Sequence, residues 1–186
     1  MHFQPTPIGG AFEISIDWQR DPRGAFGRTF CRQEFATYGL NRDLFQCSVS
    51  QNSAARTVRG FHLQATPHEE AKLVHCIDGR IFDVALDLRA GSPTYGRHHA
   101  VELSAANGKM LYIPEGCAHG FQTLENDTAI MYYISTFYEP ASSRGVRWND
   151  PALKVAWPFV DGVILNERDQ ALPLLADYAT GSDGNS

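Results

Sequence analysis

The chain has 186 residues, of which 43% are hydrophobic and 20% charged, as expected for one soluble globular domain with a full hydrophobic core. Its formal net charge of −5 argues against nucleic acid as the main partner, because contacts to phosphate groups need a basic face. No apolar run approaches the roughly 20 residues of a membrane helix, and the N-terminus lacks a basic start followed by an apolar segment. We therefore expect no membrane anchor and no signal peptide.

The four cysteines, Cys31, Cys47, Cys76 and Cys117, lie far apart and form no Cys-x-x-Cys pair. This spacing favours neither disulfides nor a zinc site. We expect reduced thiols in a cytoplasmic protein.

In chain order, residues 1–56 predict irregular structure and short strands, with a turn at Asp21–Gly24. The strands predicted after it cover residues 72–77, 80–89, 99–103, 109–114 and 128–138. Asp78-Gly79 separates the first two and favours a two-residue hairpin, and Gly108 is expected to adopt a positive φ in a later turn. Many strands at short spacing predict an all-β sandwich or closed barrel.

The C-terminal third differs from the β region. Helical periodicity is confined to a short segment around 170–178, which predicts a helical extension. We expect a single domain over 1–179 and a disordered tail at 180–186, because the tail has no apolar residues to bury.

The stretch Gly108–Phe121 has the spacing Gly-x5-Pro-x-Gly-x2-His, which resembles the second motif of the cupin family of small jelly-roll barrels. Pro114 and Gly116 would form a tight turn that directs His119 into the mouth of the barrel. The fold class implied is a cupin-type jelly roll with a helical C-terminal extension.

Metal-dependent cupins add a His-x-His pair and a glutamate from an earlier strand. Here the corresponding place reads His62-Leu63-Gln64, and an amide is a weak ligand for a divalent transition metal. His68, Glu69 and Glu70 follow, but the polar residues around Pro67 predict a loop. A metal-dependent isomerase or oxygenase stays an alternative that the sequence disfavours.

The stretch "VRGFHLQ", Val58–Gln64, places two ionisable residues in an apolar strand. Strand alternation puts His62 and Gln64 on one face and Arg59 on the other. Arg59 could join His62 only if Gly60 forms a bulge or bend, which glycine within a strand often marks. The alternative is a structural histidine beside a surface arginine.

Three further segments carry polar residues that are ordinary when each is considered alone. Lys72 begins an apolar strand and could be a strand-end lysine that extends to solvent. Tyr132 and Tyr138 fall on one face of a predicted strand and could be core aromatics. Arg168 and Asp169 follow the β region and could be a solvated ion pair. None of these segments decides the function.

Together, the segments resemble the dTDP-4-dehydrorhamnose 3,5-epimerase family from roughly residue 10 to residue 175. The matching segments, in the order in which the family has them, are DPRGAF, VRGFHLQ, AKLVHCIDGRIFDVALDLRAGSPTYG, ELSAANGKMLYIPEGCAHGF and RGVRWNDPALKVAWP. The resemblance implies a metal-free jelly roll without cofactor that forms homodimers. Its substrate would be a nucleotide-diphosphate-linked 4-keto-6-deoxy sugar, with no nucleic acid or membrane as partner.

The resemblance also implies a role for each matching residue. His62 is expected to be the general base, with Asp169 hydrogen-bonded behind it. Tyr132 is expected to be the acid on the opposite face of the sugar, and Lys72 to lie near the keto oxygen. The implied substrate-binding residues are Arg23 (reaching over from the partner subunit), Arg28, Arg59, Gln64, His119, Tyr138 and Arg168.

These residue types suit the removal and return of a proton beside a ketone. The resulting enolate needs positive charge or a hydrogen bond at its oxygen, which Lys72 can supply. An imidazole, with an ordinary pKa of about 6.5, accepts a proton near neutral pH. A phenol, with an ordinary pKa of about 10, keeps its proton until the enolate takes it. Arg59 offers a guanidinium fork to the diphosphate.

Three places differ from the commonest pattern of the family. Arg28 stands where a glutamate is common, and Cys47 and Val49 replace a Gln-x-Asn pair. Both places belong to the nucleotide pocket that the resemblance implies, so the nucleotide is open among dTDP, CDP and GDP. Tyr133 replaces a lysine and is expected to point away from the Tyr132 face.

The sequence leaves two alternatives to an enzyme that inverts both carbon 3 and carbon 5. A mono-epimerase would invert only carbon 3 or only carbon 5, and the residues do not decide between them. A sugar-nucleotide-binding protein without catalysis is disfavoured, because His62, Asp169, Tyr132 and Lys72 are all present.

Overall fold

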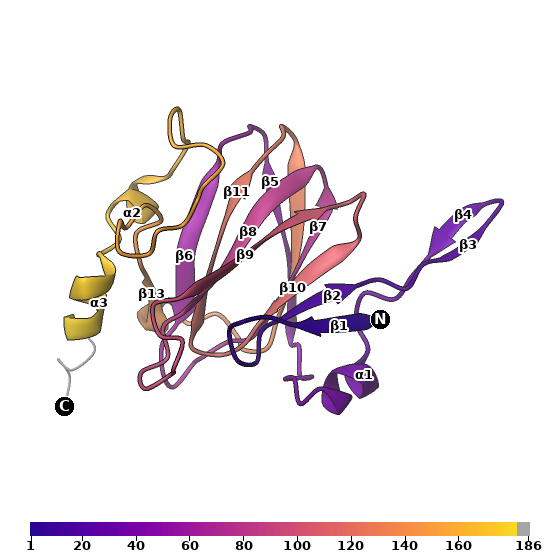
Figure 1. Cartoon of the computed structure of the whole chain (residues 1–186), viewed down its shortest axis with the longest axis horizontal. Coiled ribbons are helices and arrows are strands. Elements are labelled where there is room, and N and C mark those ends of the chain that lie inside the picture. The colour runs from indigo at the N-terminus through magenta and orange to yellow at the C-terminus, as the bar shows by residue number, and fades with distance from the viewer. Residues whose placement is uncertain (182–186) are drawn as a thin grey trace.

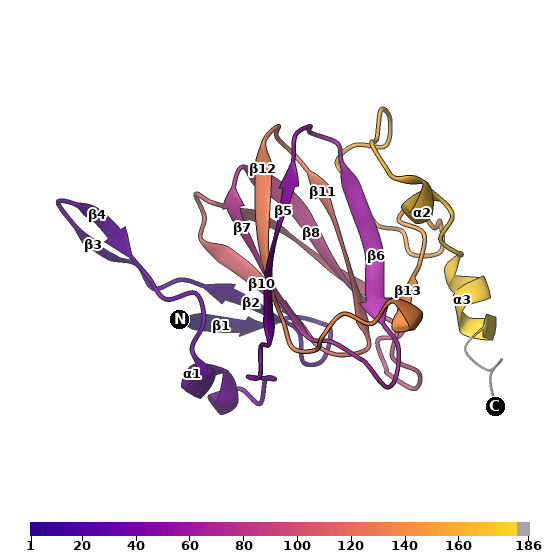
Figure 2. The same cartoon turned by 180° about the vertical axis from the view of Figure 1, so that it is seen from behind.

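The computed structural model describes residues 1–181 and consists of two antiparallel β-sheets that face each other, with helices at the two ends of the chain (Figures 1 and 2). The six-stranded sheet has the order β1 (His2–Pro5), β2 (Phe12–Ser15), β10 (Lys109–Ile113), β7 (Lys72–Asp78), β12 (Thr128–Ile134), β5 (Gln46–Asn52). The five-stranded sheet has the order β13 (Ser143–Gly145), β6 (Val58–Gln64), β11 (Cys117–Thr123), β8 (Arg80–Asp87), β9 (His98–Ser104).

From β5 to β13 the chain passes repeatedly from one sheet to the other, which is the path of a jelly roll. The predicted all-β jelly roll is therefore confirmed. A separate hairpin of β3 (Gln19–Asp21) and β4 (Gly24–Phe26), built on the turn predicted at Asp21–Gly24, projects away from the two sheets (Figures 1 and 2).

The hairpin predicted at Asp78-Gly79 is wrong. A turn does form, and Gly79 has a φ of 70°, but β7 and β8 leave it for different sheets. β7 pairs with β10 and β12, whereas β8 pairs with β9 and β11. Residue preferences within a turn do not distinguish a hairpin from a barrel corner, because the distinction depends on strands far away in the sequence. Gly108, with a φ of 59°, forms another such corner, and its predicted positive φ is confirmed.

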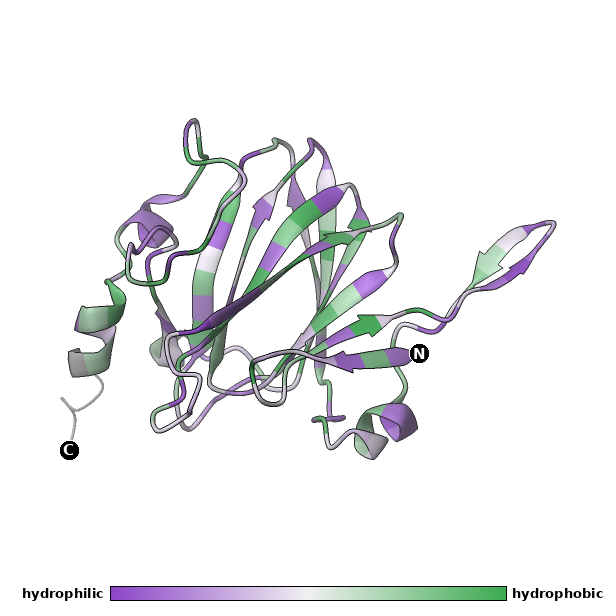
Figure 3. Ribbon diagram, in the orientation of Figure 1, coloured by the Kyte–Doolittle hydropathy of each residue, from purple (hydrophilic) through white to green (hydrophobic). Residues whose placement is uncertain are grey.

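The core lies between the two sheets, where alternate residues of each strand point inward. Figure 3 shows hydrophobic residues, coloured green, along the strands of both sheets. The buried inner side chains include Val74, Cys76, Ile81, Ala85, Leu103, Leu111, Phe121 and Ile130. A barrel filled in this way supports a small number of polar side chains at fixed positions on its inner wall.

Two further apolar clusters cover the outer faces of the sheets. The segment after β13 packs Trp148 and Trp157 against the five-stranded sheet. The N-terminal part packs Phe35, from helix α1 (Arg32–Thr37), against the six-stranded sheet. Helix α1 was not predicted and lies where irregular structure was expected. Six residues with one buried aromatic are too few to give a periodic pattern.

The C-terminal extension contains helices α2 (Glu167–Gln170) and α3 (Leu175–Gly181), as predicted. The expected tail at 180–186 lies outside the described residues, except that residues 180 and 181 end α3. The strand predicted over 128–138 stops at Ile134, because Ser135 and Thr136 turn to bind the backbone of Ala71 and Glu69. No helix within residues 1–181 is long and apolar enough to cross a membrane.

The loop between β8 and β9 is organised by Asp87, whose carboxylate is fully buried. It accepts hydrogen bonds from the Arg89 guanidinium and from the hydroxyls of Ser92 and Thr94. Burial alone would raise the pKa of this carboxyl, but these donors lower it far below its ordinary value. The folded protein therefore keeps the charged form at acid pH, where the unfolded chain takes up a proton.

We expect Asp87→Asn to lower the free energy of unfolding at pH 7 by about 2 kcal/mol, because it removes the buried charge that accepts hydrogen bonds from Arg89, Ser92 and Thr94. A depressed carboxyl pKa contributes stability that is complete above the unfolded value of about 4 and is lost as the pH falls below it. The variant should therefore lose less stability than the wild type on going from pH 5 to pH 3. Urea unfolding at both pH values measures this, with Asp161→Asn, at an exposed position, as the control. An equal acid sensitivity of Asp87→Asn and wild type would contradict the assignment.

Candidate active site

The inner wall of β6 is bent at Gly60. In the pairing with β11, His62 lies opposite His119 and Arg59 lies opposite Phe121, so β6 carries one extra residue between these pairs. Gly60 has a φ of 116°, and a Cβ atom there would come within 2.6 Å of the His119 carbonyl oxygen. The bulge that the sequence named as the condition for bringing Arg59 to the side of His62 is therefore present at Gly60, and a residue with a Cβ atom would collide with β11 there.

His62 is held by the carboxylate of Asp169. Its Nε2 atom lies 2.7 Å from Asp169 Oδ1, and the backbone N–H of Gly60 donates to Asp169 Oδ2 at 3.0 Å. The side chain of Asp169 is 1% exposed, whereas that of His62 is 34% exposed. Nδ1 of His62 has no hydrogen-bond partner among residues 1–181 and is left for a ligand.

The electrostatic state of Asp169 follows from the same contacts. Burial raises the pKa of its carboxyl. The His62 ring, the Gly60 N–H and Arg168 together lower this pKa by more than burial raises it, so the net shift is downward. The carboxylate is therefore ionised at neutral pH. An ionised partner favours the tautomer with the proton on Nε2, which leaves the lone pair of Nδ1 free to accept a proton.

Tyr132 projects from β12 on the opposite sheet. Its ring meets the ring of His119 edge-on, with 5.7 Å between centroids. Burial raises the pKa of the Tyr132 phenol, the nearby Asp83 raises it further, and Arg59 lowers it by less. The phenol therefore stays protonated at neutral pH, and its hydroxyl has no hydrogen-bond partner among the described residues. His62 and Tyr132 thus approach His119 from two different sheets.

His119 itself is fixed by Asp83, a residue that the sequence did not single out. Its Nε2 atom lies 2.6 Å from Asp83 Oδ1, and Asp83 is fully buried. The other oxygen, Asp83 Oδ2, is the one buried side-chain polar atom without a hydrogen-bond partner in the described part of the chain. The sequence could have pointed to Asp83, because strand alternation puts it on the same inward face as Ile81 and Ala85, where a carboxylate is unusual.

Lys72 and Arg59 complete the polar inner wall. Lys72 as a residue is 8% exposed. Its Nζ atom donates to the backbone oxygen of His62 at 3.2 Å and forms an ion pair with Glu70 at 2.9 Å. Nε of Arg59 donates to Oδ1 of the buried Asn52 at 2.8 Å. Asn52 was not predicted, because an asparagine at a strand end usually only marks a turn.

The remaining residues with expected roles lie further away. Gln64 uses its whole amide for backbone contacts, donating to the carbonyls of His68 and Phe137 and accepting from the N–H of Glu139. Tyr138 is 56% exposed just beyond β12, and the exposed Arg168 donates to the hydroxyl of Ser143. These two therefore stand at the rim.

Arg23 and Arg28 are not brought to His62 within the chain. The Arg23 side chain is 89% exposed at the tip of the β3–β4 hairpin and is paired with Asp21. Arg28 is also exposed and is paired with Glu34. No contact within the described residues supports their expected role in substrate binding.

Cys47 and Val49, the two residues of β5 that differ from the commonest family pattern, face away from the inner wall. Tyr133 lies opposite Cys47, and Tyr132 lies opposite Ser48, so Cys47 and Val49 share the outer face with Tyr133. Tyr133 packs in the outer cluster with Phe30 and Phe35, which confirms its expected orientation. Cys47 and Val49 therefore do not line this chain's own site.

The residues present do not form a metal centre. No three His, Cys, Asp or Glu side chains within residues 1–181 are arranged to hold an ion. His62 and His119 are neighbours across β6 and β11, but each turns Nε2 to its own carboxylate.

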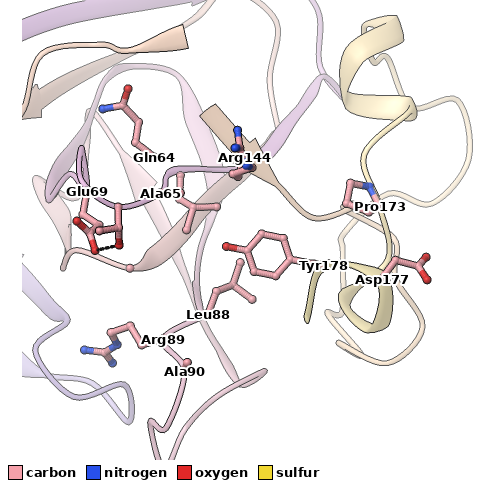
Figure 4. Close-up of a pocket in the computed structure, with 13 residues that line it drawn as sticks. Gln64, Ala65, Glu69, Leu88, Arg89, Ala90, Arg144, Pro173, Asp177 and Tyr178 are labelled. Carbon is pink, nitrogen blue, oxygen red and sulfur yellow. Dashed lines mark hydrogen bonds between the residues drawn. The ribbon is translucent and has the colours of Figure 1, made fainter. Parts of the chain in front are cut away.

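A separate cleft of about 730 Å³ lies beyond the end of β6, beside α3 (Figure 4). Its lining includes Gln64, Glu69, Arg89, Arg144 and Tyr178, but none of the acid–base residues described above. Arg89 and Glu69 there are already bound to Asp87 and Thr66.

A jelly roll with a carboxylate-fixed imidazole on one sheet and a protonated phenol on the other has the groups that an isomerase needs for proton transfer. Comparison with known proteins gives the same class. The family model for dTDP-4-dehydrorhamnose 3,5-epimerase matches residues 5–177, so the chain belongs to that family of cupin-type epimerases.

Individual relatives agree with the family model. The chain is 40% identical over 177 residues to a dTDP-4-dehydrorhamnose 3,5-epimerase of Sinorhizobium fredii, covering 95% of this chain and 91% of the relative. The crystal structure of a dTDP-4-dehydrorhamnose 3,5-epimerase from Elizabethkingia anophelis superposes with a TM-score of 0.92 at 37% identity, covering 95% and 97% of the two chains. A 3'-monoepimerase from Streptomyces bikiniensis in complex with dTDP-quinovose gives 0.90 at 32% identity, covering 98% and 91%.

Proposed function

We propose that this epimerase inverts carbon 3, carbon 5 or both in a nucleotide-diphosphate-linked 4-keto-6-deoxyhexose, through an enolate and without a metal. The observation that carries the proposal is the His62–Asp169 pair on one inner wall with the protonated Tyr132 on the other. A sugar ring between two such walls can lose a proton on one face and regain one on the other. The family supports the substrate class.

The first step removes a proton from the carbon beside the ketone. Nδ1 of His62 is the ring nitrogen without a protein partner, so it takes the proton. The resulting imidazolium is stabilised by the Asp169 carboxylate 2.7 Å from Nε2. The electrons left on the substrate move to the keto oxygen, where the ammonium group of Lys72 stabilises the enolate.

The second step returns a proton to the opposite face. Burial and Asp83 raise the pKa of the Tyr132 phenol, so the group holds its proton until a strongly basic carbanion is present. Proton loss to solvent is disfavoured for the same reason. Because a ketone at carbon 4 acidifies carbons 3 and 5 alike, one such pair can serve both carbons in different sugar poses.

The nucleotide end requires positive charge around the diphosphate. We assign Arg59 to the phosphate oxygens, since its guanidinium keeps further N–H donors beside the one given to Asn52. His119, Arg168 and Tyr138 are assigned to the rest of the substrate, and Gln64 to support of the loop beside it. We propose dTDP as the nucleotide, because relatives of this chain are dTDP-sugar epimerases.

We further propose that the protein is a homodimer in which Arg23 enters the partner's site. The β3–β4 hairpin projects from the body and carries Phe26 with 76% exposure, and Val49 and Ile77 on the outer face of the six-stranded sheet are 53% and 38% exposed. A second copy would cover these apolar side chains. The four cysteines form no disulfide, which supports a cytoplasmic location. The family supports a role in deoxysugar biosynthesis.

The test of the function is proton NMR in deuterated water with dTDP-, CDP- and GDP-linked 4-keto-6-deoxyglucose. We expect deuterium to enter carbon 3, carbon 5 or both of the dTDP sugar. His62→Asn should reduce exchange by about 10³-fold or more, because it removes the base but keeps a hydrogen-bonding side chain of similar polarity. Circular dichroism controls for folding, and near-normal exchange in a folded His62→Asn variant would refute the base assignment.

Tyr132→Phe should separate proton removal from inversion. Abstraction by His62 does not need the phenol, so deuterium should still enter the first carbon while the inverted product is strongly reduced. The measurement compares the rate of deuterium uptake with the rate of product formation in the same NMR series. Loss of both rates to the same extent would mean that Tyr132 is needed before proton abstraction.

The placement of Arg23 is tested by subunit mixing. Arg23→Ala and His62→Asn should each be poorly active alone, but their co-expressed mixture should regain activity. In a mixed dimer, the Arg23→Ala subunit keeps its own His62 and receives an intact Arg23 from its neighbour. No gain on mixing, in a preparation that ultracentrifugation shows to be dimeric, would place Arg23 outside the partner's site.

A further inference from the structure

Glu70 lies beside Lys72 on the inner wall, although neither the family resemblance nor the proposed mechanism assigns it a role. Residues 70 and 72 point inward, and Ala71 between them packs in the outer cluster. Oε1 of Glu70 is 2.9 Å from Nζ of Lys72, and the two side chains are 9% and 10% exposed. The pair is therefore almost fully removed from solvent.

A buried ammonium group is unstable as a charge unless an acid compensates it. Without a counter-ion, burial favours the neutral amine, which has no positive charge to offer an enolate. Glu70 supplies the compensation at contact distance. Ion pairs screened from water are also geometrically restrictive, because each partner loses much of its freedom to turn.

The contacts of Lys72 also limit where it can point. An ammonium group has three hydrogens. One is donated to the backbone oxygen of His62 at 3.2 Å, and the carboxylate of Glu70 lies 2.9 Å from the same nitrogen as an ion pair. At least one N–H is left for a substrate oxygen. Since His62 carries the base, the Lys72–His62 contact also sets the position of the ammonium group relative to that base.

We propose that Glu70 is a positioning residue for catalysis: it pairs with the Lys72 ammonium group and turns it so that a remaining N–H meets the keto oxygen of the sugar. This inference rests on the proposed function. Glu70 touches Lys72 and not the substrate, so it should affect the stability of the enolate more than the binding of the nucleotide sugar.

Glu69 provides a matched control one residue away. Its carboxylate accepts a hydrogen bond from the Thr66 hydroxyl and faces the separate cleft of Figure 4. Glu69→Gln makes the same chemical change in the same loop, outside the acid–base site. We expect Glu69→Gln to leave kcat and KM unchanged within about twofold.

The test compares kcat and KM for Glu70→Gln, Glu70→Asp, Lys72→Met and the double variant Glu70→Gln/Lys72→Met. We expect Glu70→Gln to lower kcat by about tenfold or more with KM changed less than about threefold, because the lost interaction acts on the transition state. Glu70→Asp should retain more of kcat than Glu70→Gln. In the Lys72→Met background, Glu70→Gln should have no further effect on kcat.

The proposal is overturned if Glu70→Gln keeps wild-type kcat, or if it lowers kcat by the same factor with and without Lys72. Thermal unfolding of the same four variants tests the pair without reference to activity: Glu70→Gln should lower the Tm in the wild-type background but not in Lys72→Met. If Glu70→Gln lowers the Tm only when Lys72 is present, but the wild type exchanges no proton of any 4-ketosugar, the proposed function is refuted and the Glu70–Lys72 pair is not. An equal change in Tm on Glu70→Gln with and without Lys72 would refute the positioning role itself.

Discussion

The carboxylate of Asp169 joins the C-terminal extension to the bent strand β6, and the remaining site geometry depends on this junction. One oxygen accepts the N–H of Gly60 at the bulge, and the other meets Nε2 of His62. The bulge is possible because Gly60 has no Cβ to collide with β11. A single buried charge therefore fixes the strand, the imidazole and its tautomer together.

The inner wall shows a general solution to the burial of ionisable groups. Asp169, Asp83 and Glu70 are each at most 9% exposed, and each lies within 3 Å of a side-chain nitrogen of the site, in His62, His119 and Lys72 respectively. An unpaired charge would be unstable at these depths, whereas a paired one is strongly oriented. Proton transfer can therefore occur between groups that are already in position, which lowers the reorganisation that the reaction requires.

Chemistry and recognition occupy different parts of the molecule. His62 and Tyr132 project from within the seven-residue paired strands β6 and β12, while Tyr138 stands on a loop, Arg168 on the short helix α2 and Arg23 on the projecting hairpin. Loops can change without disturbing the barrel, so related epimerases can keep one reaction and differ in substrate. The outward orientation of Cys47 and Val49 follows the same division, since these altered positions lie outside the chain's own inner wall.

The sequence by itself determined the all-β class and marked Gly60 as a place where a bulge could form, because alternation and turn preferences act over a few residues. The expected roles of His62, Tyr132, Lys72 and Asp169 came from the resemblance of the whole chain to a family, and no single segment gave them. It failed for the Asp78-Gly79 hairpin and missed the pairing of Asp83 with His119. Only the tertiary structure decided these, since β7 and β8 belong to different sheets and Asp83 and His119 are 36 positions apart. Contacts at such separations depend on which sheets bury one another, and this is a property of the whole chain rather than of any short segment.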